Sequence, residues 1–447
     1  MDWVINLEEK LGGDKISKAV DDWKKRAIYR VSTCAKDLNP RAYLPHAVSF
    51  GPFHCNEVEL KLQMDVHKHR ALHHFLEQSG KPLTGYVNEL LAVLPDLMAS
   101  YDSLDICWQQ DEFLQLMLLD GCFMLEILRA NDEIKIPNDV YGDYDGVADP
   151  IFSYHGKVYV MPYIKRDMLM LQNQLPMLLL RTLVEATIAK KDSVIYLNKI
   201  ILSFVNPGYK IPSNQQQVDS LHVLDLYRKS LLGLGQSQTT TLIPETTRKS
   251  KFCFCIEQKE STADIVRSAM KLHESGVDFK ASDSTSIMDI SFRGGKLKLP
   301  AIIVDDTTES AFLNLVAFER VHVGAGNEVT SFVSFMDNII DSAKDVSLLH
   351  SSGILNNHIG SDEAVANLFN GISKDVTPDP AGSLEKVHKE LDDYCSKKCN
   401  EWRANLKHTY FKSPWASVSL FAAIFVILLT TAQTLYAILS YHHPLKS

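Results

Sequence analysis

A run of 22 residues near the C-terminus, 418 to 439, contains no Asp, Glu, Lys or Arg. As an α-helix rising about 1.5 Å per residue it covers the roughly 30 Å hydrocarbon core of a bilayer. Buried helices of soluble proteins, the alternative, are rarely this long without a charge. We therefore predict a membrane anchor, which consists of Val418, Leu420, Phe421, Ile424, Phe425, Val426, Ile427, Leu428, Leu429, Gln433, Leu435, Ile438 and Leu439.

The polar residues of this run differ in what they require. A Ser or Thr hydroxyl in a helix can donate a hydrogen bond to the backbone carbonyl one turn earlier. We expect this bond for Ser419, Thr430, Thr431 and Thr434. The longer amide of Gln433 is expected to seek a partner outside its own helix.

The flanks of the run predict its orientation. The twenty residues before Trp415, 395–414, contain five basic residues, whereas only Lys446 follows the run; the five are Lys397, Lys398, Arg403, Lys407 and Lys412. By the positive-inside rule, the N-terminal body stays in the cytosol and the short tail crosses. Residues 1–25 contain no apolar stretch of the kind that a secretory signal has. We expect a single-pass, tail-anchored protein of the plasma membrane or an endomembrane.

The remaining composition is that of a globular protein, with 447 residues, 45% of them hydrophobic and 23% charged. The net charge of −9 disfavours nucleic acid as a partner, because phosphate binding needs clustered Lys and Arg. The eight cysteines follow no repeating framework and are expected to be reduced thiols. The expected partners are therefore the lipid bilayer and an unidentified protein, with no cofactor, and the oligomeric state stays open.

The pattern along the chain predicts a mainly α fold with a small β-hairpin, an α+β arrangement, followed by one transmembrane helix. We expect an N-terminal amphipathic arm at 1–27 and a helical domain at 28–411. The domain carries a flexible polar insertion at about 233–262, and the anchor and tail follow at 412–447. Residues 138–150 are expected to form a loop, and 47–50 an extended segment between prolines.

Apolar residues at helical spacing predict most of the secondary structure. One helix, at 87–101, is expected to be interrupted at Pro95, and another, at 166–189, to be kinked or split at Pro176. One helix is expected to follow Ser261 and to end at His273. The remaining helices are expected at 57–78, 112–129, 222–232, 309–320, 331–345, 348–355, 362–371 and 384–411. The hairpin is expected to pair 288–292 with 297–299 around Gly294-Gly295.

Four histidines form the densest group of possible metal ligands: His67, His69, His73 and His74. His69 and His73 have the i, i+4 spacing that two zinc ligands use, but a zincin motif needs Glu at position 70, which is Arg. A partly buried histidine helix explains the group better. The pairs Cys253/Cys255 and Cys395/Cys399 each supply half a metal site. We predict no metal site.

Catalytic motifs are absent. There is no Gly-x-Ser-x-Gly and no phosphate-binding Gly-x-x-x-x-Gly-Lys-Ser/Thr sequence. The acid pairs Asp305/Asp306 and Asp337/Asp341 are expected to be helix caps or solvated faces. Asn173 is expected to be structural, bound to a carbonyl that Pro176 frees. We therefore predict no catalytic residue, and a protein that is not an enzyme.

Several ordered segments together resemble the plant DUF247 family, also called the UPF0481 proteins. They are Ala42-Tyr43-x-Pro45-x-x-Val48-Ser49-x-Gly51-Pro52-Phe53-His54, Met64-Asp65-x-His67-Lys68, Leu119-Asp120-Gly121-Cys122-Phe123-x-Leu125-Glu126, Arg166-Asp167, Asn173-Gln174-Leu175-Pro176, His222-x-Leu224-Asp225-Leu226, Ser275-Gly276-Val277-x-Phe279, Asn314-Leu315-x-Ala317-Phe318-Glu319 and Tyr410-Phe411-x-x-Pro414-Trp415. The chain departs from the family pattern at Ser32, at Cys55-Asn56, and at Gln172, where Glu is usual.

The resemblance implies a mostly helical, plant-specific, membrane-anchored protein with no established enzyme activity. Some grass members are implicated as pollen-side determinants of self-incompatibility. Our leading hypothesis is a non-catalytic recognition or signalling protein. The alternatives are a purely structural tether, and an enzyme of unrecognised class whose site would gather dispersed residues: His54, His67, Asp120, Asp167 and Asn173.

Overall fold

A computed structural model describes most of the body and the C-terminal helix. The described residues are Val4, Tyr209 and the ranges 23–104, 108–131, 149–186, 190–207, 218–233, 268–376, 384–397 and 414–442. Most of the expected arm, loop 138–150 and polar insertion lie outside them, as do Cys253, Cys255 and Cys399.

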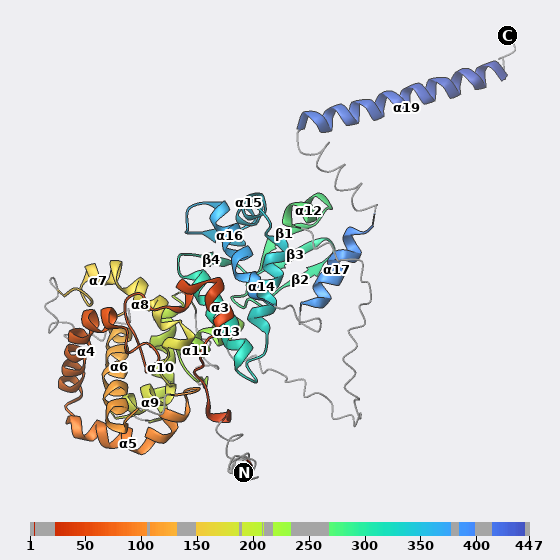
Figure 1. The fold of residues 1–447 in the computed structure, drawn as a ribbon. Coiled ribbons are helices and arrows are strands. Elements are labelled where there is room, and N and C mark those ends of the chain that lie inside the picture. The colour runs from red at the N-terminus through yellow and green to blue at the C-terminus, as the bar shows by residue number, and fades with distance from the viewer. Residues whose placement is uncertain are drawn as a thin grey trace.

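Within the described residues, the N-terminal half is built of helices (Figure 1). α4 packs along α6, and α5, α9 and α10 also contact α6. The elements are α3 (Thr33–Leu38), η1 (Pro40–Tyr43), α4 (Val58–Ser79), α5 (Leu83–Ala99), α6 (Gln110–Ala130), α7 (Tyr154–Tyr159), α8 (Met161–Met168), η2 (Leu171–Asn173), α9 (Met177–Glu185), α10 (Lys190–Val205) and α11 (Val223–Leu232).

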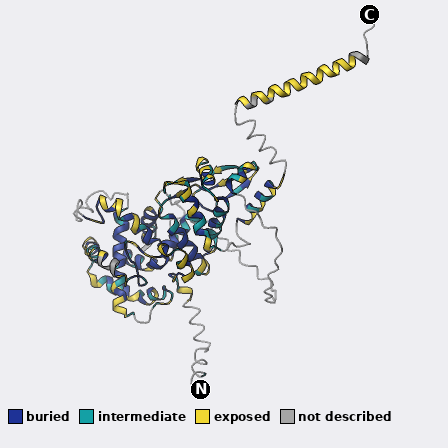
Figure 2. Cartoon of the chain, turned by 45° about the horizontal axis from the view of Figure 1, so that its top comes forward, coloured by how far each residue is buried: buried dark blue, intermediate teal, exposed yellow. Residues whose placement is uncertain are grey.

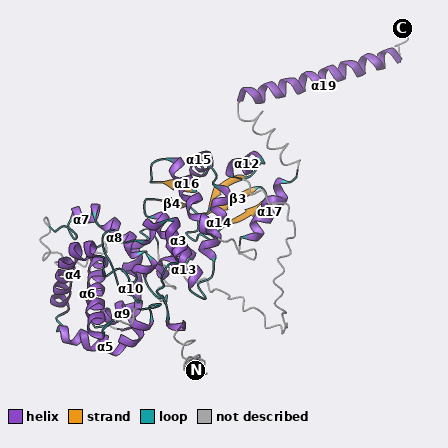
Figure 3. Ribbon diagram, in the orientation of Figure 1, coloured by secondary structure: helices purple, strands orange, loops and turns teal. Residues whose placement is uncertain are grey.

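The second half adds short strands to its helices, and Figure 3 shows the sheet that contains β3 between α12, α14 and α17, with β4 beside α16. α13 lies in the middle of the body and contacts η1 and η2 on one side and α14 and α16 on the other. The elements are α12 (Ala269–Glu274), β1 (Asp278–Ala281), β2 (Ser291–Arg293), β3 (Lys296–Leu299), β4 (Ile302–Val304), α13 (Thr308–Val321), α14 (Glu328–Ile339), α15 (Ala343–Ser351), β5 (Leu355–Asn357), α16 (Asp362–Ile372), η3 (Ser373–Asp375), α17 (Glu385–Cys395) and α19 (Pro414–His442).

The predicted hairpin is confirmed. β2 pairs antiparallel with β3, and Phe292 lies opposite Leu297 with both side chains buried. Gly294 and Gly295 between the strands both have positive φ, 58° and 80°, as a two-residue type I′ turn requires. The sequence did not predict the parallel pairs: β1 pairs with β3, and β4 pairs with β5.

α6 is buried nearly all round, as its apolar sequence predicts. Gly121 on this helix lets α9 approach closely, since a Cβ at Gly121 would lie 2.6 Å from Leu183 Cδ1. Replacing this glycine would therefore force the Leu183 side chain or α9 to shift.

The predicted interruption at Pro95 is wrong, because α5 continues through this residue. Pro95 lies on the exposed side of the helix, where water can bind the carbonyl that lacks its usual partner. The predicted split at Pro176 is confirmed: this proline directly precedes α9, and η2 lies before it.

Other helix boundaries also differ from prediction. A single helix at 331–345 is wrong, because α14 ends at Ile339 and a new helix begins after Ser342. The Ser342 and Asp345 side chains form a capping box there. The helix predicted to reach Leu355 ends at Ser351, since Leu355 lies in β5. Residues 398–411 of the last predicted helix lie outside the described ranges.

α19 lies apart from the body, and its described side chains are exposed (Figure 2). Its segment Phe421–Leu439 is long and apolar enough to cross a membrane, and none of it is buried against the protein. The predicted hydroxyl bonds are confirmed for three threonines, because Thr430, Thr431 and Thr434 each donate to a carbonyl one turn earlier.

Candidate functional site

Residues 44–54, which we name the core loop, run irregularly through the N-terminal half of the body. Val48 and Phe50 are fully buried. Helices and sheets satisfy their own backbone groups, but a buried loop needs side chains to do so. Polar residues from four other elements surround this loop.

Asp167 at the end of α8 binds the first part of the core loop. Its carboxylate accepts hydrogen bonds from the backbone nitrogens of His46, Ala47 and Val48 at 3.0, 2.6 and 3.0 Å. Burial raises the pKa of Asp167, and the three hydrogen bonds and the Arg166 guanidinium oppose that rise. Arg166 also donates a hydrogen bond to the carbonyl of Leu44. Asp167 and Arg166 together therefore bind backbone N–H groups and a backbone carbonyl of the core loop.

Asn173 in η2 binds the middle of the core loop. Its oxygen accepts from the Phe50 nitrogen at 2.7 Å, and its nitrogen donates to the carbonyls of Val48 and Asp167, both at 3.0 Å. The predicted structural role is confirmed. The predicted carbonyl is wrong, because the acceptors belong to Val48 in the core loop and to Asp167 at the end of α8, and Pro176 frees neither of them.

Asn314 on α13 connects this region to the second half of the protein. Its nitrogen donates to the carbonyl of Ala42 in η1 at 2.9 Å, and its oxygen accepts from the Leu171 nitrogen at 2.9 Å. Ser310, one turn earlier, donates to the same Ala42 carbonyl at 3.1 Å. One buried amide therefore joins η1, η2 and α13.

Gly51 shows how tightly the core loop is packed. Its φ is 70°, a left-handed value that favours glycine. A Cβ at this position would lie 2.9 Å from the Tyr101 hydroxyl and 3.0 Å from the Gln174 carbonyl. The positive φ and the lack of space for a Cβ atom therefore both require glycine at this position. The Gly51 nitrogen also donates a hydrogen bond to Asp120 at 2.8 Å.

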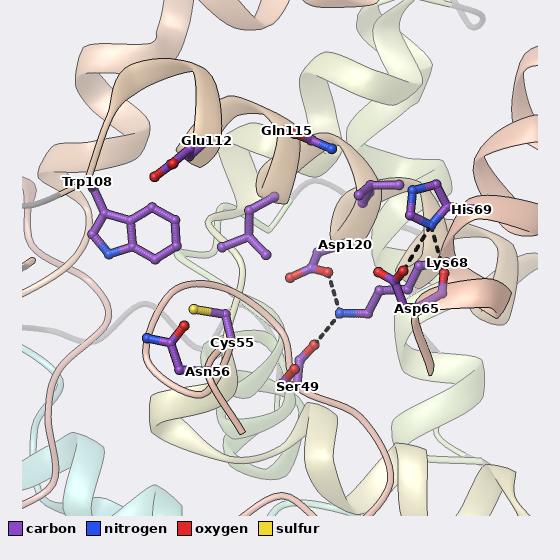
Figure 4. Close-up of a pocket in the computed structure, with 12 residues that line it drawn as sticks. Ser49, Cys55, Asn56, Asp65, Lys68, His69, Trp108, Glu112, Gln115 and Asp120 are labelled. Atoms are coloured by element: carbon purple, nitrogen blue, oxygen red, sulfur yellow. Dashed lines mark hydrogen bonds and ion pairs between the residues drawn. The ribbon is translucent and has the colours of Figure 1, made fainter. Parts of the chain in front are cut away.

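A buried ion pair follows at the end of the core loop. The ammonium of Lys68 on α4 lies 2.5 Å from Asp120 on α6 and donates to the Ser49 carbonyl at 2.7 Å (Figure 4). Burial raises the pKa of Asp120, and the charge and hydrogen bond of Lys68 oppose that rise. Each group of this pair therefore has a hydrogen-bond partner in the core loop.

A cavity of about 540 Å³ lies beside this ion pair, within the size range of small-molecule sites. Its walls come from α4, from the start of α6 and from the end of the core loop (Figure 4). The lining residues are Ser49, Cys55, Asn56, Asp65, Lys68, His69, Trp108, Glu112, Gln115, Leu116, Leu119 and Asp120.

The five residues of the enzyme alternative do not form one site. Asp120 lines the cavity, whereas Asp167 and Asn173 bind the core loop. His67 lies on α4 within 3.2 Å of Arg70. His54 is buried and its Nε2 has no hydrogen-bond partner; burial, then the nearby cations Lys36 and Arg30, lowers the pKa of this histidine to about 4.

The predicted metal candidates remain separate. In the part of the chain that the structure describes, no three His, Cys, Asp or Glu side chains are placed to hold a metal ion. His73 lies beside Glu77 and His74 beside Glu126, so these histidines have carboxylate neighbours. Cys395 is buried on α17.

The acid pairs follow the prediction in part, since Asp306 and Asp341 are exposed. Asp305 accepts hydrogen bonds from the Thr307 nitrogen and the Thr308 hydroxyl, but the N-cap of α13 is Thr307, so Asp305 is not the cap of this helix. Asp337 lies on α14, but Asp341 follows the end of that helix, so their predicted placement on one helix is wrong.

Sequence reasoning missed the residues that line the cavity. It also missed that the separate motifs meet, since Lys68, Asp120, Asp167, Asn173 and Asn314 all bind the core loop or η1. The sequence did contain a signal for this arrangement. Each motif has a polar residue among apolar ones, which indicates a buried polar residue that needs a partner from another segment.

Comparison with known proteins agrees with this arrangement. Residues 28–429 match the family DUF247, described as a plant protein of unknown function. UPF0481 protein At3g47200 of Arabidopsis thaliana is 32% identical over 437 residues, which cover 94% of this chain and 87% of that protein. Putative UPF0481 protein At3g02645, also of Arabidopsis thaliana, is 22% identical over 516 residues, which cover 96% and 93%. No solved structure matches. The buried motifs and the match over nearly the whole chain establish that this chain belongs to the plant DUF247 family.

Proposed function

We propose that this protein is a non-catalytic recognition protein attached to a membrane by α19, with its body in the cytosol. The observation that carries the proposal is the contrast between exposed apolar side chains on α19 and a body whose motif residues are bound to one another. An exposed apolar helix of this length is stable in lipid, and basic residues precede it.

The dispersal of the five polar residues supports the non-catalytic part. A catalytic group must reach substrate, but Asp167 and Asn173 are fully buried and their polar atoms bind backbone groups. The cavity at Asp120 is the observation that favours an enzyme instead. Its buried acid is already paired with Lys68, which leaves it poorly placed to exchange protons.

Recognition needs an exposed surface, and α7 and α8 offer one. Tyr154, Val158, Tyr159 and Tyr163 are 83%, 43%, 63% and 55% exposed. Tyrosine is enriched among residues that dominate protein interfaces, because its ring is large and its hydroxyl tolerates water. We propose that this tyrosine face, defined by these four residues, binds a partner protein.

Topology is tested with tags at each end of the full chain in sealed microsomes. The proposal requires that added protease removes the N-terminal tag and leaves the C-terminal tag intact. Protection of the N-terminal tag would overturn the orientation.

The tyrosine face is tested by cross-linking the full chain in its native membrane and identifying the linked proteins. Tyr159→Ser combined with Tyr163→Ser should remove specific partners. Val323→Ser is the matched control, because Val323 is 98% exposed on another part of the body. Partners retained by the tyrosine variant, or lost equally from both variants, contradict the proposal.

The family resemblance suggests pollen self-incompatibility as one setting for such recognition. In that setting, the partners cross-linked from self-pollinated and cross-pollinated tissue should differ. Identical partners from both tissues would contradict a role in self-incompatibility but would not contradict the recognition proposal.

A further inference from the structure

The cavity beside Lys68 and Asp120 has two different sides (Figure 4). Trp108 and Glu112 lie on one side, His69 and Asp65 lie on the opposite side, and the Lys68–Asp120 pair lies between them. Trp108 is held in place by an edge contact with Phe113, whose ring centroid lies 6.0 Å away. The cavity is thus bounded by an aromatic ring, carboxylates and a neutralised ion pair.

The charge of the lining favours a cationic occupant. Lys68 lies 2.5 Å from Asp120, so its positive charge is already balanced and attracts an anion weakly. Two further carboxylates, Asp65 and Glu112, line the same cavity. His69 lies 3.7 Å from Asp65, and among the described residues no basic side chain forms an ion pair with Glu112. The lining therefore has three carboxylates for one ammonium.

The apolar part of the lining favours an alkyl stem. Leu116 and Leu119 line the cavity along with Trp108. An indole face attracts an ammonium group through its π electrons. An occupant with methylene groups and one charged end would match both kinds of surface.

We propose that this cavity binds a primary ammonium group carried on an alkyl stem. Glu112 binds the ammonium, Trp108 covers it, and the leucines contact the methylene groups. Asp65, on the opposite side, binds the second ammonium when the occupant is a diamine. The occupant is either a free aliphatic diamine or a lysine side chain of another protein. The proposal depends neither on the topology of α19 nor on the tyrosine face.

Isothermal titration of the full chain in nanodiscs tests the charge. Cadaverine is the probe for a free amine, and Nα-acetyl-lysine N-methylamide is the probe for a lysine side chain. The tighter binder of the two identifies the source. 1,5-Pentanediol has the same stem without the charges and should bind at least about tenfold more weakly than cadaverine. Equal binding of diol and diamine, or no saturable binding of either amine, overturns the proposal.

Variants then test the site. Glu112→Gln keeps the shape of the side chain and should weaken amine binding by about tenfold, and Trp108→Leu should weaken it by several fold. Asp111→Asn is the matched control, because Asp111 lies in the same first turn of α6 but does not line the cavity. Unchanged thermal midpoints establish that the variants fold. An equal loss in Asp111→Asn and Glu112→Gln would show general attraction to an acidic protein and would contradict the site.

Discussion

The core loop and α19 place their side chains in opposite ways. The loop brings polar backbone groups into the interior, where Asp167, Asn173 and Asp120 bind them. α19 exposes apolar side chains at positions that no part of the body covers. In water, the first arrangement is stable because these buried backbone groups have side-chain partners, whereas the second is unfavourable because large apolar surface stays hydrated.

This difference indicates that the two regions depend on different surroundings. The body binds the backbone groups of the core loop with its own side chains and should fold without lipid. α19 satisfies its backbone and three threonines internally but leaves its apolar surface for another medium. Changes in one region should therefore leave the other unaffected.

The largest expected effect follows from placing charge in α19. Two lysines near the helix centre each cost about 2.5–3.5 kcal/mol of insertion free energy, which offsets most of what the apolar residues contribute. Ile424→Lys combined with Leu428→Lys should move the protein from the membrane to the soluble fraction after carbonate extraction. The thermal midpoint of the body should not change.

The control for this change is Ile424→Leu with Leu428→Ile, which preserves hydrophobicity. A lysine variant that stays in the membrane would show that another part of the chain also attaches to lipid. A variant whose body unfolds would show that α19 packs against the body, and would remove the contrast between the two regions.

The next effect concerns the interior of the body. Asp167→Ala would leave three N–H groups, one buried and two partly buried, and the Arg166 guanidinium without this acceptor. We expect a loss of about 4 kcal/mol or more in the free energy of unfolding, measured by urea denaturation. Asp167→Asn keeps one acceptor oxygen and should lose less.

Asp306→Ala is the matched control, because Asp306 is an exposed acid near the start of α13. Membrane attachment of the Asp167 variant should stay normal as long as the protein is not degraded. A loss below about 1 kcal/mol would show that the core loop finds other partners, such as water.

A smaller effect depends on pH. Burial lowers the pKa of both His54 and His222 to about 4, and an unfolded histidine has a pKa near 6.5. Between these values the unfolded chain binds protons that the folded body does not bind. The free energy of unfolding should therefore fall as pH drops from about 6.5 to 4, by roughly 3 kcal/mol for each histidine.

His54→Gln removes one of these groups and should make the free energy of unfolding less dependent on pH in this range. Urea denaturation at several pH values measures the difference from the unaltered protein. His350→Gln, at an exposed position, is the control. An unchanged pH dependence would show that His54 is protonated in the folded body.

The sequence predicted features that depend on neighbouring residues. The apolar pattern of α6, the Gly294-Gly295 turn and the helix boundary at Pro176 are all determined within a few positions. Pro95 was misjudged because the cost of a proline depends on whether the freed carbonyl meets water, which is a property of the fold.

The site was harder to predict because its contacts join distant segments. Asp167 binds residues about 120 positions away, and Asn314 binds Ala42 across 272 positions. β4 and β5 pair across the whole of α13, α14 and α15. A polar residue in an apolar segment indicates that a partner exists, but the periodicity of one segment carries no information on which backbone group that partner is.

The smallest expected effect concerns Gln433, the amide within α19. The neighbouring threonines bind their own helix, and the structure gives no partner within the described residues for the Gln433 side chain. In lipid this amide gains by contacting another helix, and such a bond contributes about 0.6 kcal/mol on average. Gln433→Leu should therefore leave membrane attachment intact and weaken association between full-length copies, measured by energy transfer in nanodiscs, by about threefold. Leu429→Ile, which keeps the apolar surface, should not change it. Unaltered energy transfer in the Gln433 variant would mean that α19 contacts lipid alone, and the contrast with the internally bound core loop would then be complete.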